Sequence, residues 1–391
     1  MEFLLKPLQV MIMNKTNIVI IGAGISGLSI AYHLAKQGEK DIVVLDKGYF
    51  TNGATGRCGA GVRQQWATKQ NCLLAKKSME FFEKAHNILE YDDLELKQEG
   101  YLIVATTDDE VKQFKENVKL QNSLGIPTQY LTKQQALEIV PHLNPNAFIS
   151  ATFNQSDGHL NPFKTSEAFY LACKKLGVTF HFYEEVLSID KKDDVFVVTS
   201  NKDSYAATKV VNAAGGYAYE VGMMVDVELP VYSENHEILA TEPIEKFQGP
   251  MVMSFSKNIY CQQVPHGAFL MGRSDPTVKK GHDVQSTATF LKEMSKTIMD
   301  LLPKIGELRV VRTWGGSYNL SPDRQPIIGK TNVENYYVAC GFSGHGFMLA
   351  PMVGLLMSEI MCNKTPSMDV EFLSIDRFKY QTSFDIEKSV V

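Results

Sequence analysis

The chain has 391 residues and a formal net charge of -5, with 44% hydrophobic and 21% charged residues. This length exceeds the usual size of one hydrophobic core, so we expect two domains in a soluble globular protein. An acidic balance without a long basic run gives no electrostatic footprint for nucleic acid and argues against it as a partner.

The start of the chain and the cysteines indicate where in the cell the protein is expected. The apolar segment 3–13 is short and lacks both a basic beginning and a cleavage site, so we expect no secretory leader. No stretch reaches the ~18 apolar residues of a membrane helix. The six cysteines are scattered, without a CxxC pair or metal-ligand spacing, which favours reduced thiols and no metal site. We therefore expect a cytoplasmic protein without a transmembrane segment, and peripheral attachment to a membrane stays open.

A glycine-rich turn, Gly22-Ala23-Gly24-Ile25-Ser26-Gly27, separates a predicted strand at 17–21 from a helix that ends near Gly38. In such a turn the first glycine permits the tight bend, the second lets the backbone approach a pyrophosphate, and the third lets helix pack on strand. A second strand, 42–45, ends on Asp46, nineteen positions after the last glycine, where a carboxylate can bond a ribose hydroxyl. The motif predicts a dinucleotide site, and the acid at 46 argues against NADP while NAD and FAD stay open.

Helices and strands alternate along the rest of the chain. The C-terminal third is expected to add one strand, at 336–340, and an apolar helix after it. The periodicity predicts helices at 67–89, 108–124, 134–139, 162–176, 286–302 and 347–362, and strands at 102–105, 178–183, 186–189, 195–199, 205–211 and 336–340, with a strand-rich stretch at 231–272.

Three further motifs are Thr55-Gly56-Arg57-Cys58-Gly59-Ala60-Gly61-Val62-Arg63, Asn212-Ala213-Ala214-Gly215 and Gly341-Phe342-Ser343-Gly344-His345-Gly346-Phe347. With the opening turn, they resemble the FAD-dependent D-amino-acid oxidase, glycine oxidase and sarcosine oxidase superfamily over nearly the whole chain. The run Gly61-Val62-Arg63-Gln64-Gln65-Trp66 is most similar to the β subunits of multi-subunit sarcosine oxidase and dye-linked L-proline dehydrogenase.

The resemblance implies an α/β fold with a Rossmann-like FAD-binding domain of the GR2 type and a substrate domain built on a large mixed sheet. We assign residues 1–95, 150–225 and 319–391 to the first domain, and 96–149 and 226–318 to the second. FAD would lie extended across the first domain, with its flavin ring facing the second. Substrates in the family are small amines or amino acids, which are oxidised to imines by hydride transfer to flavin.

The predicted cofactor site combines backbone turns, helix N-termini and one basic side chain. The turn at 343–347 precedes an apolar helix, whose N-terminus would stabilise an anionic reduced flavin. Arg57 is flanked by glycines, which favours contact with the cofactor. The residues assigned to cofactor binding are Gly22, Gly24, Ile25, Ser26, Gly27, Asp46, Lys47, Thr55, Gly56, Arg57, Ala60, Gly61, Val62, Val186, Ala214, Gly215, Gly344, His345, Gly346, Phe347 and Met348.

Four residues are assigned to the substrate side. Tyr260 and Tyr318 match family positions that line the substrate cavity, where a phenol supplies an apolar wall and one hydrogen bond to a carboxylate. Arg63 is a second candidate carboxylate clamp. His345 either contacts the flavin or only satisfies a backbone carbonyl, and it is not assigned as a general base. Packed tyrosines and a surface arginine are the alternatives for the other three.

Departures from the family pattern shape the expected chemistry. No cysteine stands near Gly316, where monomeric sarcosine oxidases attach FAD, so we expect non-covalent FAD. Met348 stands where those enzymes have a lysine for the substrate carboxylate. The strand at 268–271, where oxidases place a lysine over the flavin, is apolar, which disfavours transfer to oxygen. Some β subunits also hold FMN at a subunit interface; the corresponding region is 157–162, and there we expect His159 in a loop next to the cofactor or capping the following helix.

The first hypothesis is a FAD-dependent dehydrogenase for a secondary amine such as L-proline, hydroxyproline or sarcosine, acting as one subunit of a complex that accepts the electrons. The second is a self-sufficient glycine, D-amino-acid or sarcosine oxidase that releases hydrogen peroxide. The third is a flavin-carrying electron-transfer subunit without its own amine site. An NAD-linked dehydrogenase is the remaining rival, and it explains only the first fifty residues.

Overall fold

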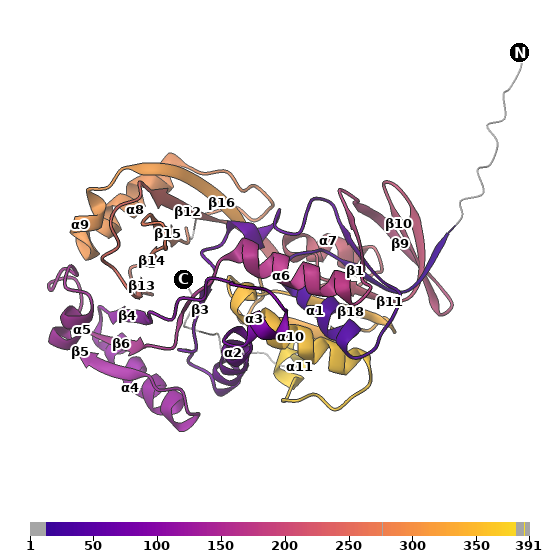
Figure 1. The fold of residues 1–391 in the computed structure, drawn as a ribbon, viewed down its shortest axis with the longest axis horizontal. Helices are drawn as coiled ribbons and strands as arrows, with labels where there is room; N and C mark the ends of the chain where they lie inside the picture. Colours follow the sequence, from indigo (N-terminus) through magenta and orange to yellow (C-terminus); the bar gives the residue numbers. More distant parts are fainter. Residues whose placement is uncertain (1–12, 276, 381–386, 388–391) are drawn as a thin grey trace, which may run out of the picture.

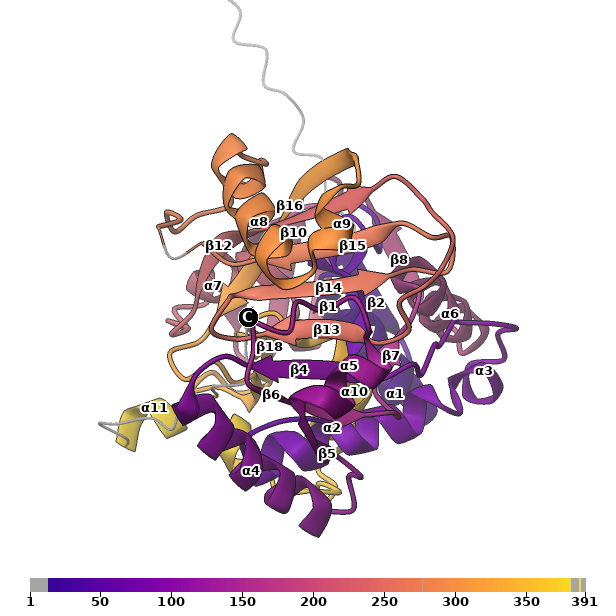
Figure 2. The same ribbon diagram turned by 90° about the vertical axis from the view of Figure 1, so that its left-hand side faces the viewer.

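The protein, for which we have a computed structural model describing residues 13–275, 277–380 and 387, contains two large β-sheets that lie side by side (Figures 1 and 2). Residues 3–12, on which the expectation about a secretory leader rests, lie outside the described residues. Within the described ranges, none of the helices combines the length and apolar character needed to cross a bilayer.

The first sheet has a parallel centre. Strand β1 (Asn14–Ile21) pairs in parallel with β2 (Ile42–Asp46) on one side and with β11 (Ser204–Asn212) on the other. Because the carboxyl ends of parallel strands meet at one edge of a sheet, the turns after these three strands come together there. The other strands of this sheet are β8 (Thr179–Phe182), β9 (Val186–Lys192), β10 (Val195–Ser200), β17 (Ile327–Lys330) and β18 (Tyr336–Cys340).

Four helices cover one face of this sheet and share one apolar core with it: α1 (Ile25–Lys36), α2 (Lys69–Phe82), α6 (Pro162–Lys175) and α10 (Gly346–Met361). Helices α1 and α10 pack very closely, since a Cβ at Gly354 would lie 2.2 Å from Ser29 Oγ. Helix α6 begins at Pro162 and is capped by Asn161, whose side chain accepts from the N–H groups of residues 163 and 164.

The second sheet is mixed, and β13 with β4 is its parallel pair. Helix α8 (Ala288–Leu301) covers one face with Phe290, Met294, Ile298 and Leu301, which recur at helical spacing. The opposite face looks toward the first sheet. The strand order is β16 (Val310–Leu320), β12 (Tyr232–Thr241), β15 (Phe269–Arg273), β14 (Ile259–Gln263), β13 (Met251–Ser254), β4 (Tyr101–Ala105), β6 (Ser150–Asn154) and β5 (Gln129–Thr132).

Short elements connect these layers. A two-stranded ladder of β3 (Gly61–Val62) and β7 (Gly158–His159) lies where the chain passes between the sheets. The remaining elements are η1 (Ala54–Arg57), α3 (Ala85–Ile88), α4 (Asp108–Ser123), α5 (Lys133–Ile139), η2 (Gly215–Tyr217), α7 (Ala218–Met223), α9 (Pro303–Gly306), η3 (Glu371–Leu373) and α11 (Arg377–Tyr380).

The chain runs repeatedly between the two sheets, and the architecture is the α/β one expected. The division into domains at 95/96, 149/150, 225/226 and 318/319 stays a proposal. The expectation of one further C-terminal strand was wrong, because β16 and β17 precede β18. Gly315 and Gly316 interrupt the apolar pattern of β16, yet its pairing with β12 along ten residue positions of that strand overrides their low strand propensity.

Candidate functional site

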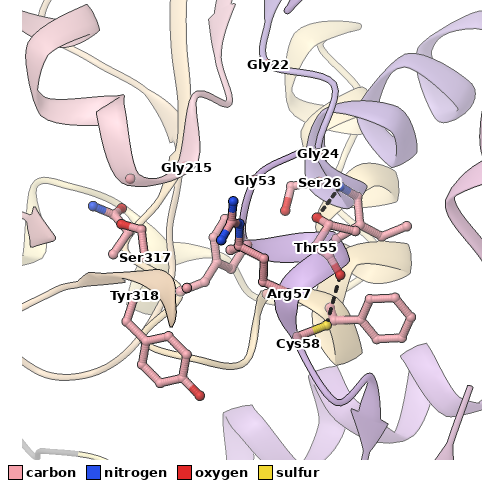
Figure 3. A pocket seen from close by; sticks show the side chains of 18 of the residues that line it. Gly22, Gly24, Ser26, Gly53, Thr55, Arg57, Cys58, Gly215, Ser317 and Tyr318 are labelled. Carbon is pink, nitrogen blue, oxygen red and sulfur yellow. Dashed lines mark hydrogen bonds between the residues drawn. The ribbon is translucent and has the colours of Figure 1, made fainter. Parts of the chain in front are cut away.

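The turn after β1 requires its glycines for two close approaches. Gly22 has a φ of +104°, and a Cβ there would lie 2.3 Å from the carbonyl oxygen of Ala213 after β11. A Cβ at Gly27 would lie 2.0 Å from the Gly22 carbonyl oxygen. Helix α1 therefore starts directly against the strand ends. The Ile25 N–H donates to Thr55 Oγ1 at 3.1 Å, while Gly24 supplies no side-chain cap. Figure 3 shows Thr55 next to Gly24 and Ser26.

Asp46 is the last residue of β2 and lies at the same edge of the sheet. Its Oδ2 accepts from the Ala23 N–H and its Oδ1 from the Gly48 N–H, each at 2.7 Å. Burial raises the pKa of this carboxyl, against the two backbone donors and Lys47, which lower it. Two carboxylate oxygens offer about four acceptor positions, so the side chain can still accept from a ligand hydroxyl. Lys47 lies over the Tyr217 ring, 2.9 Å from its centroid.

The loop around η1 joins the two sheets. Arg57 donates from Nη1 to the Gly315 carbonyl oxygen of β16 at 2.9 Å and from Nε to the Asn52 carbonyl oxygen at 3.3 Å. In return, Trp314 Nε1 donates to the Arg57 carbonyl oxygen at 2.9 Å. A Cβ at Gly56 would lie 2.2 Å from the Thr51 carbonyl oxygen, so this turn also needs glycine. Arg57 thus fixes the loop against the second sheet while its side chain borders the cavity.

The turn between β18 and α10 also borders the cavity. Ser343 and Gly344 both have positive φ, 48° and 93°, and a Cβ at Gly344 would lie 2.6 Å from Tyr318 Cε2. Helix α10 begins at Gly346 without a side-chain cap from His345. Its first N–H groups are therefore available to a ligand, and their contact with a flavin stays a prediction.

His345 is a buried neutral imidazole. Its Nδ1 lies 2.6 Å from the Phe342 carbonyl oxygen, and because a carbonyl only accepts, Nδ1 carries the proton. Its Nε2 has no hydrogen-bond partner among the described residues. Burial lowers the pKa to about 3, and the Arg63 charge acts in the same direction. Of the two alternatives for His345, contact with the flavin or a hydrogen bond to a backbone carbonyl, the structure shows the hydrogen bond. The side chain carries no positive charge.

Arg63 is buried rather than solvated. Its Nη1 donates to the Gln65 carbonyl oxygen at 2.6 Å, and its guanidinium lies 3.9 Å from the centroid of the Trp66 ring. The Trp66 ring in turn meets His345 edge-on at 4.6 Å. Arg63, Trp66 and His345 therefore form one packed group, of which Arg63 and His345 border the cavity.

Asp157 anchors the segment that carries Arg63. Its buried carboxylate accepts from the Gln64 N–H at 2.8 Å, Gln65 Nε2 at 3.0 Å and Asn154 Nδ2 at 2.9 Å. Burial raises its pKa to about 7, although the Gln64 and Gln65 donors and the Arg63 charge lower it. The same region corrects an expectation: His159 lies in strand β7, is buried, and neither caps α6 nor borders the cavity.

Tyr260 and Tyr318, both assigned to the substrate side from the sequence, lie in an aromatic wall on the second sheet. Between them lies His236 of β12, parallel to both rings, with centroids 5.8 Å from Tyr260 and 4.1 Å from Tyr318. Gly272 of β15 makes this possible, because a Cβ there would lie 2.1 Å from Tyr260 Oη. Burial lowers the pKa of His236 to about 3.

The Gly22 turn, Asp46, the loop at Arg57, the turn at 343–347, Arg63 and the aromatic wall border one cavity of about 470 Å³. Figure 3 shows Gly22, Gly24 and Thr55 on one side of this space and Tyr318 of β16 on another. Gly27, Gly56 and Val62 do not border the cavity but shape the turns behind it. The predicted site residues that border it are Gly22, Gly24, Ile25, Ser26, Asp46, Lys47, Thr55, Arg57, Ala60, Gly61, Arg63, Val186, Ala214, Gly215, Tyr260, Tyr318, Gly344, His345, Gly346, Phe347 and Met348.

Sequence reasoning missed His236 and Tyr101, which also border the cavity. His236 lies in a polar strand sequence, and Tyr101 precedes the strand that was expected to begin at Leu102. For both, a large polar ring on the alternate positions of a strand was the available signal.

The comparisons with known proteins agree with this geometry. A family model described as DAO, FAD dependent oxidoreductase, matches residues 17–360. The chain is 28% identical over 371 residues to the sarcosine oxidase subunit beta of an Arthrobacter species, spanning 93% of this chain and 91% of that protein. It is 25% identical over 372 residues to the glycine oxidase of Geobacillus kaustophilus, spanning 93% and 97%. The solved structure of L-proline dehydrogenase from P. horikoshii superposes with a TM-score of 0.88 at 35% identity, over 94% of this chain and 99% of that one. The chain belongs to the DAO family of FAD-dependent oxidoreductases.

Proposed function

We propose that the protein oxidises a small secondary amine or amino acid, such as L-proline, hydroxyproline or sarcosine, to an imine, and passes the electrons to an acceptor other than oxygen. The observation that carries this proposal is the single cavity that extends from the Gly22 turn to the wall of Tyr260 and Tyr318. A cofactor bound at the Gly22 turn and a substrate bound at Tyr260 and Tyr318 would therefore share one cavity and could come into contact. The 35% identity to an L-proline dehydrogenase supports the choice of substrate class.

The residues present fit FAD. The N-terminus of α1 suits a pyrophosphate, Asp46 suits a ribose hydroxyl, and the N-terminus of α10 suits the flavin end. When bound, FAD supplies the acceptor for the hydride that leaves the substrate carbon. Among the described residues, Cys58 is the cysteine that borders the cavity, and burial raises its pKa to about 11. A thiol that stays protonated supports non-covalent binding.

The chain's own contribution is positioning, not strong acid or base catalysis. Tyr260 and Tyr318 present phenols, and His345 is neutral at ordinary pH. The substrate nitrogen therefore needs to release its proton to solvent beforehand, so that its lone pair can form the C=N bond as the hydride leaves. Arg63 places a positive charge at the border of the same cavity and suits a substrate carboxylate.

The absence of a lysine near the aromatic wall supports an acceptor other than oxygen. In the described ranges, Lys47 is the lysine that borders the cavity, and it lies at the nucleotide end over Tyr217. Strand β15 carries Phe269, Leu270 and Met271 instead. We propose a partner subunit, a second flavin or a quinone as acceptor, and the similarity to a sarcosine oxidase subunit beta supports a partner. FMN at a subunit interface stays a prediction.

The test is a dye-linked assay of the FAD-loaded protein against proline, hydroxyproline, sarcosine, glycine and D-amino acids, with hydrogen peroxide measured in parallel under air. The proposal expects dye reduction with a secondary amine and little peroxide. Stoichiometric peroxide in air would support the oxidase hypothesis. A flavin band that no amine bleaches would support an electron-transfer subunit without an amine site.

A further inference from the structure

Tyr101 reaches the place where the two sheets meet. It is the first residue of β4, where it pairs with Asn154 of β6 and Met251 of β13. Its side chain is 2% exposed and borders the cavity beside Met251 and Met253. A Cβ at Gly61 would lie only 1.8 Å from Tyr101 Oη, so this hydroxyl touches the loop that would hold the cofactor. Tyr101 is therefore positioned between the cofactor loop and the substrate wall.

The Tyr101 hydroxyl shares a feature with those of Tyr260 and Tyr318. All three residues border the cavity, and among the described residues none of the three hydroxyls has a hydrogen-bond partner. The three hydroxyls face the cavity and do not belong to the buried atoms that lack a partner, so each offers a hydrogen bond to whatever occupies that space.

The three phenols are also close to one another. Burial raises the pKa of each, and both Tyr318 and Tyr101 add to the rise at Tyr260. They therefore stay protonated and act as hydrogen-bond donors. The Arg63 charge opposes the rise at Tyr101, so a positive charge lies near that hydroxyl. Three neutral donors, one of them near a guanidinium, form a setting that favours a carboxylate.

We propose that Tyr101 contacts the substrate and donates its hydroxyl, together with those of Tyr260 and Tyr318, to the carboxylate of a small amino acid. This inference rests on the proposed function. It gives the carboxylate neutral phenols and Arg63 as partners, whereas Met348, which also borders the cavity, offers no charge.

The test is the substitution Tyr101→Phe in the FAD-loaded protein, with Tyr130→Phe as matched control. Tyr130 lies in β5 of the same sheet, packs against the same apolar cluster as Tyr101, and does not border the cavity. The probes are tetrahydrofuran-2-carboxylate, in which a ring oxygen replaces the amine of proline, and tetrahydrofuran, which lacks the carboxylate. Neither probe is a substrate, and their dissociation constants come from the shift of the flavin absorbance band.

We expect Tyr101→Phe to weaken carboxylate binding about 10-fold or more, the usual effect of one hydrogen bond to a charged group. Tyr130→Phe should bind like the wild type, and neither change should alter tetrahydrofuran binding. If Tyr101→Phe binds the carboxylate as tightly as the wild type, the assignment of Tyr101 is overturned while the proposed function stands. A wild-type protein that binds neither probe and oxidises no amino acid overturns both.

Discussion

The imidazole of His236 lies parallel to the ring of Tyr318, with centroids 4.1 Å apart and planes 1° from parallel. On its other side Tyr260 lies 5.8 Å away, with its plane at 7°. The three rings come from β12, β16 and β14, so one side chain links two tyrosines that lie on separate strands of the sheet. His236 therefore holds the rings of the aromatic wall in place and also borders the cavity itself.

Replacing His236 with alanine should let both tyrosine rings move. We expect His236→Ala to raise KM for the amine about 10-fold with a smaller change in kcat, because ring stacking contributes roughly 0.5–1.5 kcal/mol for each pair. His236→Phe keeps a ring in the stack and should restore most of the wild-type KM. Equal defects in both variants would mean that a nitrogen of the ring, and not its stacking, carries the effect.

The same histidine should make folding stability depend on pH. Its folded pKa of about 3 lies below the ordinary value of 6.5, so between these values the unfolded chain binds a proton that the folded protein does not. Stability from this group is therefore lost as pH falls below about 6.5, by about 2 kcal/mol at pH 5.

The check is denaturant unfolding of wild type and His236→Phe at pH 7 and pH 5. His345 keeps its own low pKa in both proteins, so its contribution cancels in the comparison. The wild type should lose more stability than the variant on acidification. Identical losses in the two proteins would contradict a buried neutral His236.

Particular residues show which parts of the fold could be predicted from the sequence. The Gly22 turn and the strand at 336–340 were predicted correctly because local chemistry decides them: Gly22 has a positive φ, and β18 is a short, wholly buried run. Residues 346–361 form the apolar helix within one residue of the predicted bounds. The membership of the FAD-dependent oxidoreductase family was likewise predicted from the motifs, and the family model confirms it.

Contacts between distant segments lay beyond such reasoning. Arg57 donates to a carbonyl oxygen 258 positions away, and nothing near Arg57 in the chain encodes that partner. His236 lies in a strand with few apolar residues, so its position between two tyrosines follows only from the order of β12, β14, β15 and β16. The roles of Arg63 and Tyr101 depend in the same way on how the two sheets meet.

Helix–strand packing at the dinucleotide turn gives a prediction for cofactor binding. Gly27→Ala would bring a methyl group 2.0 Å from the Gly22 carbonyl oxygen, and backbone has to move to relieve this contact. We expect a loss of about 1–3 kcal/mol in stability and a strong drop in FAD content of the purified protein. Gly249→Ala is the control, because its nearest contact would be at an ordinary 3.9 Å and it lies away from the cavity. Full FAD content in Gly27→Ala would rule out this turn as the cofactor's anchor.

Amine oxidation should accelerate with pH. His345 has a pKa of about 3 and is therefore too weak a base to remove a proton from the substrate. The substrate amine becomes reactive only after it has lost its proton to solvent. We expect kcat/KM to rise between about pH 6 and about pH 10, following the amine's deprotonation. A flat profile over that range would point instead to a protein group that removes the proton.

The most direct measurement is an anaerobic titration of the purified yellow protein with L-proline, hydroxyproline and sarcosine, following the flavin absorbance band. Binding of FAD in the cavity between the Gly22 turn and the Tyr318 wall, with the amine beside it, predicts that at least one of these amines bleaches the band completely. A protein that carries FAD yet keeps its full absorbance with every amine, or that binds no flavin, would contradict the proposed chemistry.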